Sequence, residues 1–359
     1  MSDLTFQNNV PDPLLSGKEL PTFKFELEKS KGKVLGNSFG KEATVEQLPI
    51  SKGIAGVSMQ LEAGVMRELH WHATAAEWAF VLKGRVRTKV INPAGQAETN
   101  DFEPGDIWYF PRGTPTCSSA SATNRPISFW SLTTVISPSL ARSVLPTGLD
   151  TRPSRCWRNF GLPESAFDGF PKEEVYFVRG AVPPEQIPEN LQGPSVSPPE
   201  THKFRMLAGA PHAVFKGGRE WRIDSTRFPI STTVTGVILD LEPGALRELH
   251  WHPNADEWQY VIEGDLSVTM FGSHGRFRTE QLNAGDVGYI PQGYGHSIEN
   301  VGSKPSRMLI GFNTGIYQAI DLSAWIASNP VDVLATNFGK PPSLFERFPR
   351  KDVFISPNH

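Results

Sequence analysis

The sequence contains little cysteine and has no strong excess of charge of either sign. Cys117 and Cys156 are the two cysteines among 359 residues, and they do not form the paired spacings typical of disulfide frameworks. Their scarcity favours a reducing compartment or a fold that does not depend on disulfides. The formal charge of −3, with basic residues scattered along the chain, gives no basic surface for nucleic acid or an acidic membrane. We therefore expect neither partner.

Long apolar runs are also absent. No stretch is long and apolar enough to span a bilayer, and the polar first residues lack the basic start and apolar run of a secretory signal. We therefore expect a cytoplasmic protein. The hydrophobic content of 38% in a chain of this length indicates a globular protein with room for two domains.

The chain repeats itself at a shift of 180 residues. Arg-Glu-Leu-His-Trp-His at 67–72 recurs at 247–252, and Glu-Trp at 77–78 recurs at 257–258. The same register, without a gap, aligns the later Gly-Asp and Pro-x-Gly segments and places Thr116 opposite His296. Any account of function must therefore explain one complete motif and one altered copy.

Each copy predicts short strands joined by turns. Residues 56–62 and 236–242 alternate as half-buried strands do, and a glycine turn follows each. Many such strands predict an all-β sandwich or barrel. Asn-Phe-Gly at 159–161 and 337–339 predicts a short helix ending at each glycine, so each copy carries a C-terminal helix.

Composition divides the chain into four parts. We predict an N-terminal arm at 1–45, a first barrel at 46–180, a Pro-rich linker at 181–202 and a second barrel at 203–357.

The His-x-His motif predicts a metal site inside each barrel. Residues two apart on a strand face the same side, so both histidines of a copy point into one interior. A glutamate from the next strand and a residue from a distant hairpin complete each set. The predicted ligands are His250, His252, Glu257 and His296 in the second barrel, and His70, His72 and Glu77, with Thr116 in the fourth position, in the first. Three imidazoles and one carboxylate suit Mn(II), Fe(II), Ni(II) or Zn(II) and leave open positions.

Alternatives remain for the neighbouring residues. Because Thr116 is a poor ligand, the first barrel can bind metal weakly, bind it with three ligands, or bind none. Cys117 faces the opposite side of its strand, which favours a small buried side chain over a ligand. Tryptophans 71, 78, 251 and 258 are interpreted as barrel wall or inter-domain packing.

Arg67 and Arg247 each precede the first histidine of the motif by three residues. This odd spacing points them away from the metal unless the preceding glycine turn or a bulge re-aims the chain. A re-aimed guanidinium can grip a carboxylate with two hydrogen bonds, and pairing with Glu68 or Glu248 is the alternative.

The motif from Gly244 to Gly264, followed by Pro291-x-Gly293-x-x-His296, resembles the cupin signature, and 64–84 fits equally. The doubling, the Arg-Glu-Leu-His-Trp-His string, the 285–289 segment and the Asn-Phe-Gly tails resemble the oxalate decarboxylase family of bicupins over about residues 45–357.

That resemblance implies two jelly-roll-like double-stranded β-helix barrels and a homo-oligomer. It implies Mn(2+) in each barrel, with Fe(2+) or another divalent metal as the alternative, and O2 as co-catalyst. A small carboxylate such as oxalate is held by the catalytic Arg67 and Arg247 and is converted to formate and CO2. A carboxyl group supplies the proton that formate needs.

The proton donors are where the sequence departs from the family. The lid that carries one donor falls near 137–140, and no acid lies between Asp106 and Asp150. The second donor falls at Ile310, and no acid lies between Glu299 and Asp321. Because general acid–base help is worth about 10² to 10⁴ in rate, its loss is a serious change.

Three hypotheses follow. The first is a Mn-dependent oxalate decarboxylase with another donor. The second is an oxidase, oxygenase or lyase that acts on a larger carboxylate with the second-barrel metal. The third is a non-catalytic binding protein, for which Thr116 is the main support.

Overall fold

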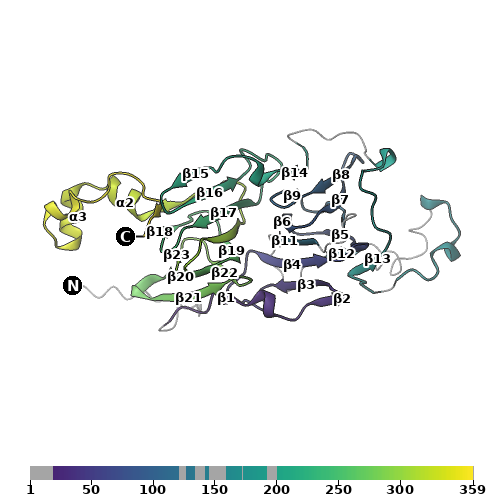
Figure 1. The fold of residues 1–359 in the computed structure, drawn as a ribbon, viewed down its shortest axis with the longest axis horizontal. Coiled ribbons are helices and arrows are strands. Elements are labelled where there is room, and N and C mark those ends of the chain that lie inside the picture. Colours follow the sequence, from purple (N-terminus) through teal and green to yellow (C-terminus); the bar gives the residue numbers. More distant parts are fainter. Residues whose placement is uncertain are drawn as a thin grey trace.

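The structure is a computed structural model that describes residues 19–120, 127–133, 142–144, 159–171, 173–191 and 200–358. Two barrels of antiparallel strands lie side by side along the long axis (Figure 1). In the part of the chain that the structure describes, each barrel consists of one seven-stranded and one six-stranded sheet. The predicted all-β architecture of two barrels is confirmed.

The first barrel joins the sheet β14-β9-β6-β11-β4-β3-β2 to the sheet β12-β5-β10-β7-β8, with β13 added beside β5. Its own strands are β2 (Lys33–Leu35), β3 (Ser38–Ala43), β4 (Ala55–Leu61), β5 (Val65–His72), β6 (Glu77–Lys83), β7 (Val86–Ile91), β8 (Ala97–Phe102), β9 (Ile107–Phe110), β10 (Thr116–Ala120), β11 (Ile127–Thr133), β12 (Arg142–Val144) and β13 (Phe177–Arg179).

The second barrel joins the sheet β1-β22-β19-β24-β17-β16-β15 to the sheet β21-β20-β23-β18-β25, with β26 added beside β18. Its own strands are β15 (Ala213–Phe215), β16 (Gly218–Ile223), β17 (Thr235–Leu241), β18 (Leu246–Trp251), β19 (Glu257–Glu263), β20 (Asp265–Phe271), β21 (Phe277–Asn283), β22 (Val287–Ile290), β23 (Gly295–Asn300), β24 (Ser306–Phe312), β25 (Ile320–Asp321) and β26 (Ile355–Ser356).

Short helices lie outside the sheets. They are α2 (Leu322–Ser328), α3 (Val331–Phe338) and α4 (Pro342–Phe345), with the 3-10 turns η1 (Leu27–Lys29), η3 (Glu164–Phe167), η4 (Glu189–Leu191), η5 (Met206–Ala208) and η6 (Ser273–Gly275). Helix α3 ends at Gly339, whose φ of 58° is left-handed and whose N–H donates to carbonyls of the last turn. The helix end predicted from the sequence therefore lies at this glycine. The residues directly before Asn159, where the helix predicted to end at Gly161 would lie, are outside the described residues.

The two barrels exchange their first strands. β1 (Lys24–Phe25) precedes the first barrel but pairs with β22 of the second, whereas β14 (Lys203–Phe204) pairs with β9 of the first. The lysine in each exchanged strand bonds an aspartate of the other barrel: Lys24 Nζ lies 2.8 Å from Asp286 and Lys203 Nζ 2.9 Å from Asp106. The repeat seen in the sequence is thus a reciprocal interlock in space.

A continuous hydrophobic core crosses the boundary between the barrels. It contains Trp78 and Tyr109 of the first barrel together with Trp258 and Tyr289 of the second. Trp78 packs against Gly236 of β17, where an added Cβ would overlap the indole ring. Trp78 is therefore an inter-domain packing residue.

The predicted domain boundaries stay predictions. The structure shows how segments of the predicted arm and linker contact the first barrel. Strands β2 and β3 lie within the predicted arm and join the first barrel's sheet. In the predicted linker, Leu191 O accepts a hydrogen bond from Thr99 and His202 contacts Glu98.

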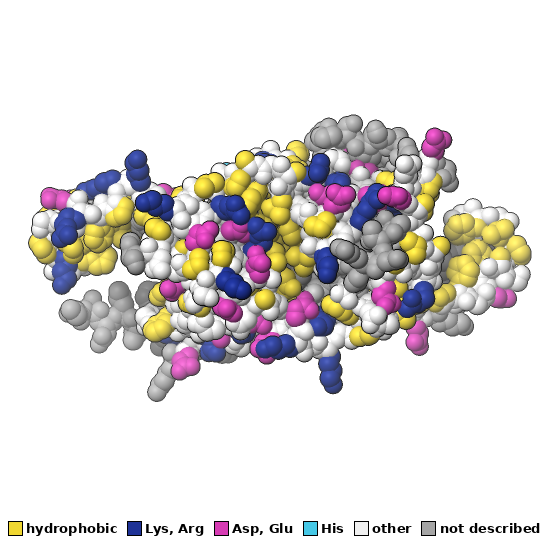
Figure 2. All heavy atoms as spheres, in the orientation of Figure 1, with side chains coloured by type: hydrophobic (Ala, Val, Ile, Leu, Met, Phe, Trp, Pro, Cys, Tyr) yellow, Lys and Arg dark blue, Asp and Glu magenta, His cyan; other side chains and the backbone are white. Residues whose placement is uncertain are grey.

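Apolar side chains gather on two extensions at opposite ends of the molecule (Figures 1 and 2). One extension is 159–171, with exposed Phe160, Leu162 and Phe170, and the other contains α2 to α4, with exposed Trp325 and Phe338. Within the described ranges, no helix has the length and hydropathy needed to cross a membrane.

Candidate metal centres and the adjoining cavity

Four side chains converge inside the second barrel. His250 lies on β18, His252 directly follows that strand, Glu257 begins β19 and His296 lies on β23. All four are buried, and one potential ligand atom from each lies within 4.8 Å of all the others. Glu257 Oε2 is 2.9 Å from the Nε2 atoms of both His252 and His296. The sheet therefore brings together the set predicted from the sequence.

Hydrogen bonds orient the rings toward one point. His250 Nδ1 lies 2.8 Å from Glu248 O, and His252 Nδ1 lies 2.7 Å from Gln318 O. A carbonyl only accepts, so each Nδ1 carries the proton and each Nε2 lone pair faces the cluster. His252 Nε2 is buried and has no hydrogen-bond partner among the described residues. An unpartnered acceptor aimed at a carboxylate and two more imidazoles fits a divalent cation.

The charge states also suit a metal. Burial, followed by the charge of Arg247, lowers the pKa of His250 well below its ordinary value. Burial alone would raise the pKa of Glu257, but the neighbouring imidazoles of His296 and His252 outweigh it and hold that pKa low. A neutral imidazole and an ionised carboxylate are the forms that bind metal.

The first barrel brings His70, His72 and Glu77 equally close. His72 Nε2 lies 3.2 Å from Glu77 Oε2, and His70 Nδ1 lies 2.7 Å from Glu68 O. Burial and Arg67 lower the pKa of His70 to about 3. Burial opposes ionisation of Glu77, but the His72 hydrogen bond and the nearby imidazoles hold its pKa at about 2.

Thr116 occupies the fourth position of this cluster. It pairs with His70 across β10 and β5, just as His296 pairs with His250 across β23 and β18. Its Oγ1 is buried and has no hydrogen-bond partner in the described part of the chain. Cys117 is half-buried, pairs with Lys89 instead, and has a thiol pKa raised by burial. It does not belong to the cluster.

The carboxylates of the two clusters are held by different donors. Glu257 Oε1 accepts from Gln259 Nε2 at 2.8 Å, whereas Glu77 Oε1 accepts from Trp108 Nε1 at 2.9 Å. Gly288 is the counterpart of Trp108 in the repeat, and a Cβ there would lie 2.5 Å from Gln259 Oε1. These outer groups were missed from the sequence. The sequence contained a signal for them, because the two copies of the repeat differ at both positions. Ala79 matches Gln259, and Trp108 matches Gly288.

Bulges re-aim both arginines. The register between β18 and β23 shifts between Arg247 and His250, and the matching shift opposite Arg67 lies between Thr116 and Ser118. Arg67 Nη1 donates to Glu68 at 3.0 Å, which is the alternative pairing considered from the sequence. Arg247 instead pairs with Asp321.

The free donor of Arg247 points to a ligand. Its guanidinium stacks on the Phe354 ring at 3.7 Å, and Nη1 also donates to Phe354 O at 3.2 Å. Nη2 is buried without a hydrogen-bond partner among the described residues. Glu248 is satisfied by other groups, namely Ser323 and the Phe354 N–H.

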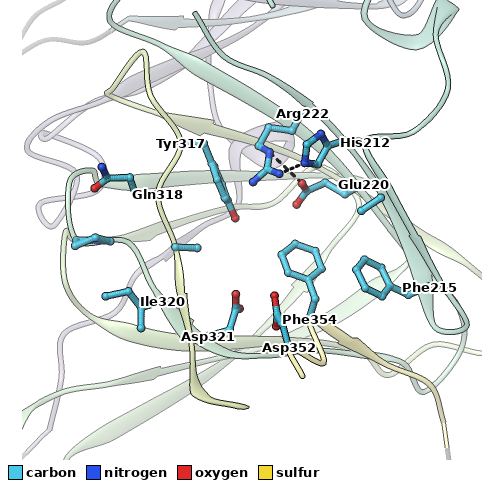
Figure 3. A pocket seen from close by; sticks show the side chains of 13 residues that line it. His212, Phe215, Glu220, Arg222, Tyr317, Gln318, Ile320, Asp321, Asp352 and Phe354 are labelled. Atoms are coloured by element: carbon cyan, nitrogen blue, oxygen red, sulfur yellow. Dashed lines mark hydrogen bonds and ion pairs between the residues drawn. The ribbon is translucent and has the colours of Figure 1, made fainter. Parts of the chain in front are cut away.

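A cavity of about 660 Å³ lies beside the second cluster. Figure 3 shows Glu220, Arg222 and His212 on one side, Asp321 and Asp352 on the other, and the Tyr317 hydroxyl pointing into the space. Tyr317 connects the cavity to the cluster, since its ring lies 5.4 Å from that of His252. Sequence reasoning missed these lining residues because they lie outside the His motif.

The structure describes one of the two positions at which the family resemblance places a proton donor. Residues 137–140 lie outside the described residues. Ile310 is on β24, buried, and paired with Val237 and Gln259. The second-barrel position is therefore apolar.

Comparisons with known proteins agree with this architecture. The Cupin family model matches residues 30–144 and 207–342. Oxalate decarboxylase OxdC of Bacillus subtilis (strain 168) is 34% identical over 307 residues, which cover 86% of this chain and 79% of that protein. A probable oxalate decarboxylase of Arthroderma benhamiae is 27% identical over 362 residues, covering 98% and 88%.

Solved structures give the same relationship. The structure of oxalate decarboxylase from Bacillus subtilis at pH 4.6 superposes with a TM-score of 0.85 at 31% identity, covering 97% of this chain and 90% of that one. A structure of the same enzyme, from work on its Mn(II) centers, also gives 0.85.

Proposed function

Because this chain belongs to the oxalate decarboxylase bicupins of the cupin family, we propose that it is a manganese-dependent carboxy-lyase that converts oxalate to formate and CO2. The observation that carries this proposal is the second-barrel cluster of three histidines and a glutamate beside the unpartnered Nη2 of Arg247.

Each group has a role in this proposal. Mn(2+) would be held by His250, His252, Glu257 and His296, and when bound it supplies positive charge and open positions for a carboxylate and for O2. Arg247 Nη2 donates to the substrate carboxylate, and Asp321 keeps the guanidinium in place. Stacking on Phe354 prevents the guanidinium from turning away.

The first barrel is proposed as a second site of lower affinity. His70, His72 and Glu77 supply three ligands, and the Thr116 hydroxyl replaces an imidazole with a weak neutral oxygen. Arg67 Nη1 is engaged by Glu68 and the carbonyl of Tyr176, as Arg247 Nη1 is by Asp321 and the carbonyl of Phe354, but Arg67 Nη2 also has a carboxylate, Glu174, at 3.6 Å. The first barrel therefore has both a weaker ligand and a more occupied arginine than the second.

One observation favours the alternative of a larger carboxylate. A cavity of about 660 Å³ has the volume of a site for a metabolite much larger than the six heavy atoms of oxalate. An oxidase, oxygenase or lyase that acts on such a compound through the second-barrel metal is the second candidate. The non-catalytic binding protein is the third.

The test is to measure formate and hydrogen peroxide from oxalate, using Mn-loaded protein in air at mildly acidic pH. We expect formate, and we expect His250→Ala to abolish it by removing a ligand. His274→Ala, which changes an exposed histidine on η6, is the matched control and should retain the activity. Peroxide without formate would indicate an oxidase. Neither product from metal-loaded protein would favour the larger carboxylate.

We also propose a homo-oligomer in the cytoplasm. The exposed apolar side chains on 159–171 and on α2 to α4 support self-association, because each extension leaves aromatic surface in water. Light scattering would contradict this if the mass were that of one chain.

A further inference from the structure

Decarboxylation to formate needs a proton at carbon. At the second-barrel position where the resemblance places the proton donor, this chain has Ile310, which carries no acidic proton. The cavity is lined by three other carboxylic acids: Glu220, Asp321 and Asp352. Asp321 is paired with Arg247, and Asp352 is exposed. Glu220 differs from Asp352 because its side chain is only 3% exposed, and from Asp321 because, in the described part of the chain, it has no hydrogen bond to an arginine.

Glu220 carries a polar atom without a hydrogen-bond partner. Its Oε1 has no hydrogen bond among the described residues, although Arg222 Nε lies 3.5 Å away. Figure 3 shows this carboxyl group beside Arg222 and His212, at the edge of the open space. A buried carboxyl oxygen that faces a cavity without a protein donor is available to a bound ligand.

Strand register places Glu220 on the same face as Ile310. Glu220 pairs with Leu239 of β17, which pairs with Met308 of β24, two residues from Ile310. Directly paired residues of adjacent strands project from one face, and so do residues two apart. Glu257 lies on this face too, because it pairs with Phe312. Glu220 therefore lies two strands away from position 310 in the same sheet, and it faces the interior that contains the predicted metal ligands.

The position of the first barrel that matches Glu220 carries no acid. The repeat counterpart of Glu220 is Gly40, where an added Cβ would lie 2.5 Å from the Tyr176 hydroxyl. That hydroxyl donates to Glu42 at 3.0 Å. The second barrel has Phe354 in place of Tyr176, and this ring also stacks on an arginine. The buried acid is therefore a feature of the barrel with the complete metal motif.

The charged groups around Glu220 favour its protonated form. Those facing it are Arg222 on its own strand, His212, Arg247, Asp321, Glu257, Tyr317 and, across the cavity, Asp352. Burial is the largest cause that raises the pKa of Glu220; Arg222 and Arg247 lower it, and Asp321 and Glu257 raise it again. The pKa is raised overall, as a proton donor near neutral pH requires.

We propose that Glu220 is the catalytic proton donor of the second barrel, an inference that rests on the proposed oxalate decarboxylation. The carbon–carbon bond of oxalate breaks, CO2 leaves, and the bonding electron pair stays on the carbon of the retained carboxylate fragment. The Glu220 carboxyl transfers its proton to that carbon, which forms the C–H bond of formate. Oxalate dianion and one proton thus give formate and CO2 with no net oxidant, and solvent entering the cavity reprotonates Glu220.

The experiment compares Glu220→Gln, Glu220→Asp and wild type, all Mn-loaded, by formate release across pH. Glu220→Gln keeps the shape but cannot donate the proton, so kcat should fall about 10²-fold or more with little change in KM. The wild-type rate should decline as pH rises through the pKa of Glu220, and this limb should be lost in Glu220→Gln. Glu220→Asp should retain part of the rate together with the limb.

Controls separate this role from a structural one. Glu42→Gln changes the acid on the corresponding strand of the first barrel and should leave formate release unchanged. A kcat for Glu220→Gln within threefold of wild type would overturn the proposal, and so would a loss of bound Mn in that variant. A larger loss in Asp352→Asn than in Glu220→Gln would assign the role to Asp352 instead.

Failure of the decarboxylase function is visible separately. If wild-type protein with bound Mn makes no formate from oxalate, the proposed function fails, and infrared spectroscopy then decides the inference. A protonated carboxyl band at neutral pH that disappears in Glu220→Gln would retain Glu220 as the proton donor of this cavity. If wild-type protein lacks this band, the proposal that Glu220 is the proton donor is overturned.

Discussion

Residues at equivalent positions of the two barrels have diverged in pairs. Gln259 with Gly288 holds the carboxylate of Glu257, and Ala79 with Trp108 holds that of Glu77. A donor reaches the same carboxylate oxygen in both barrels, but from a different strand. The geometry of the carboxylate is therefore maintained, whereas the fourth ligand position differs, with His296 in one barrel and Thr116 in the other.

Replacing Thr116 by histidine tests whether the first site has simply lost a ligand. Thr116 pairs with His70 as His296 pairs with His250, so a new imidazole starts from the correct backbone position. We expect the Mn content of Thr116→His, measured by mass spectrometry of digested protein, to rise toward two per chain. Arg112→His, in the exposed turn before β10, is the control and should not change it.

Gln259→Leu tests the hydrogen bond to Glu257. The variant removes the donor 2.8 Å from Oε1 and leaves a side chain of similar size. Because such outer partners are worth about 10- to 100-fold in metal affinity, we expect Mn binding to the second barrel to weaken by that factor in a chelator competition. Gln281→Leu on β21 changes an exposed glutamine, and an equal loss there would refute this explanation.

Among the elements, the exchanged strands β1 and β14 have the largest effect on the architecture. Each adds to the sheet of the other barrel and covers an edge strand, β22 or β9. Side-chain hydrogen bonds near these strands also join the segment that precedes one barrel to the other barrel. Glu98 of β8 accepts hydrogen bonds from Thr201 and His202, and Glu280 of β21 accepts one from Thr22. The segments preceding the barrels therefore hold the two domains together.

Glu98→Gln should weaken this interlock. Burial would raise the pKa of Glu98, but hydrogen bonds from His202 and Thr201 outweigh it and lower the pKa from 4.5 to about 2. The charged carboxylate thus stabilises the fold above pH 4.5, and its contribution is lost as pH falls from 4.5 through 2. At pH 7 we expect a loss of about 1.5–3 kcal/mol in unfolding free energy by urea denaturation.

The same measurement at lower pH checks the cause. The difference between Glu98→Gln and wild type should shrink as the pH is lowered through this window. Glu103→Gln, an exposed acid in the turn after β8, is the control and should be close to neutral. A deficit that is constant from pH 7 to 3 would show that the charge of Glu98 is not responsible.

At the scale of the whole molecule, the two barrels share one core. Trp78 and Tyr109 belong to the same buried cluster as Trp258 and Tyr289, although the residues come from different copies of the repeat. A domain that buries its aromatic side chains against another domain cannot unfold alone without exposing them. We therefore expect one cooperative transition and not two.

Gly236→Ala tests that expectation at the contact itself. The added methyl group would overlap the Trp78 indole, so either the ring or the interface must shift. We expect a loss of about 1–3 kcal/mol from this overpacking and a single calorimetric transition at a lower temperature. Gly275→Ala, where a Cβ meets no atom within 4 Å but φ is positive, separates backbone strain from overlap. Two separate transitions in wild type would contradict the shared core.

The sequence by itself determined the barrels and the clusters of histidine and glutamate inside them. Period-two strands, the 180-residue repeat and the His-x-His spacing are local patterns, and a strand automatically sends residues two apart to the same face. The absence of acids near 137–140 and at 310 was equally readable from the sequence. These features depend on neighbours in the chain, so no tertiary information was needed to predict them.

Only the tertiary structure decided which other groups surround the site. Glu220 reaches the second barrel's interior from β16, and its relation to Ile310 depends on the pairing of three strands. The bulge that re-aims Arg247 and the partner Asp321, 74 residues away, arise in the same way. Contacts between strands distant in sequence are fixed by sheet register and burial, and neither a spacing nor a composition encodes them.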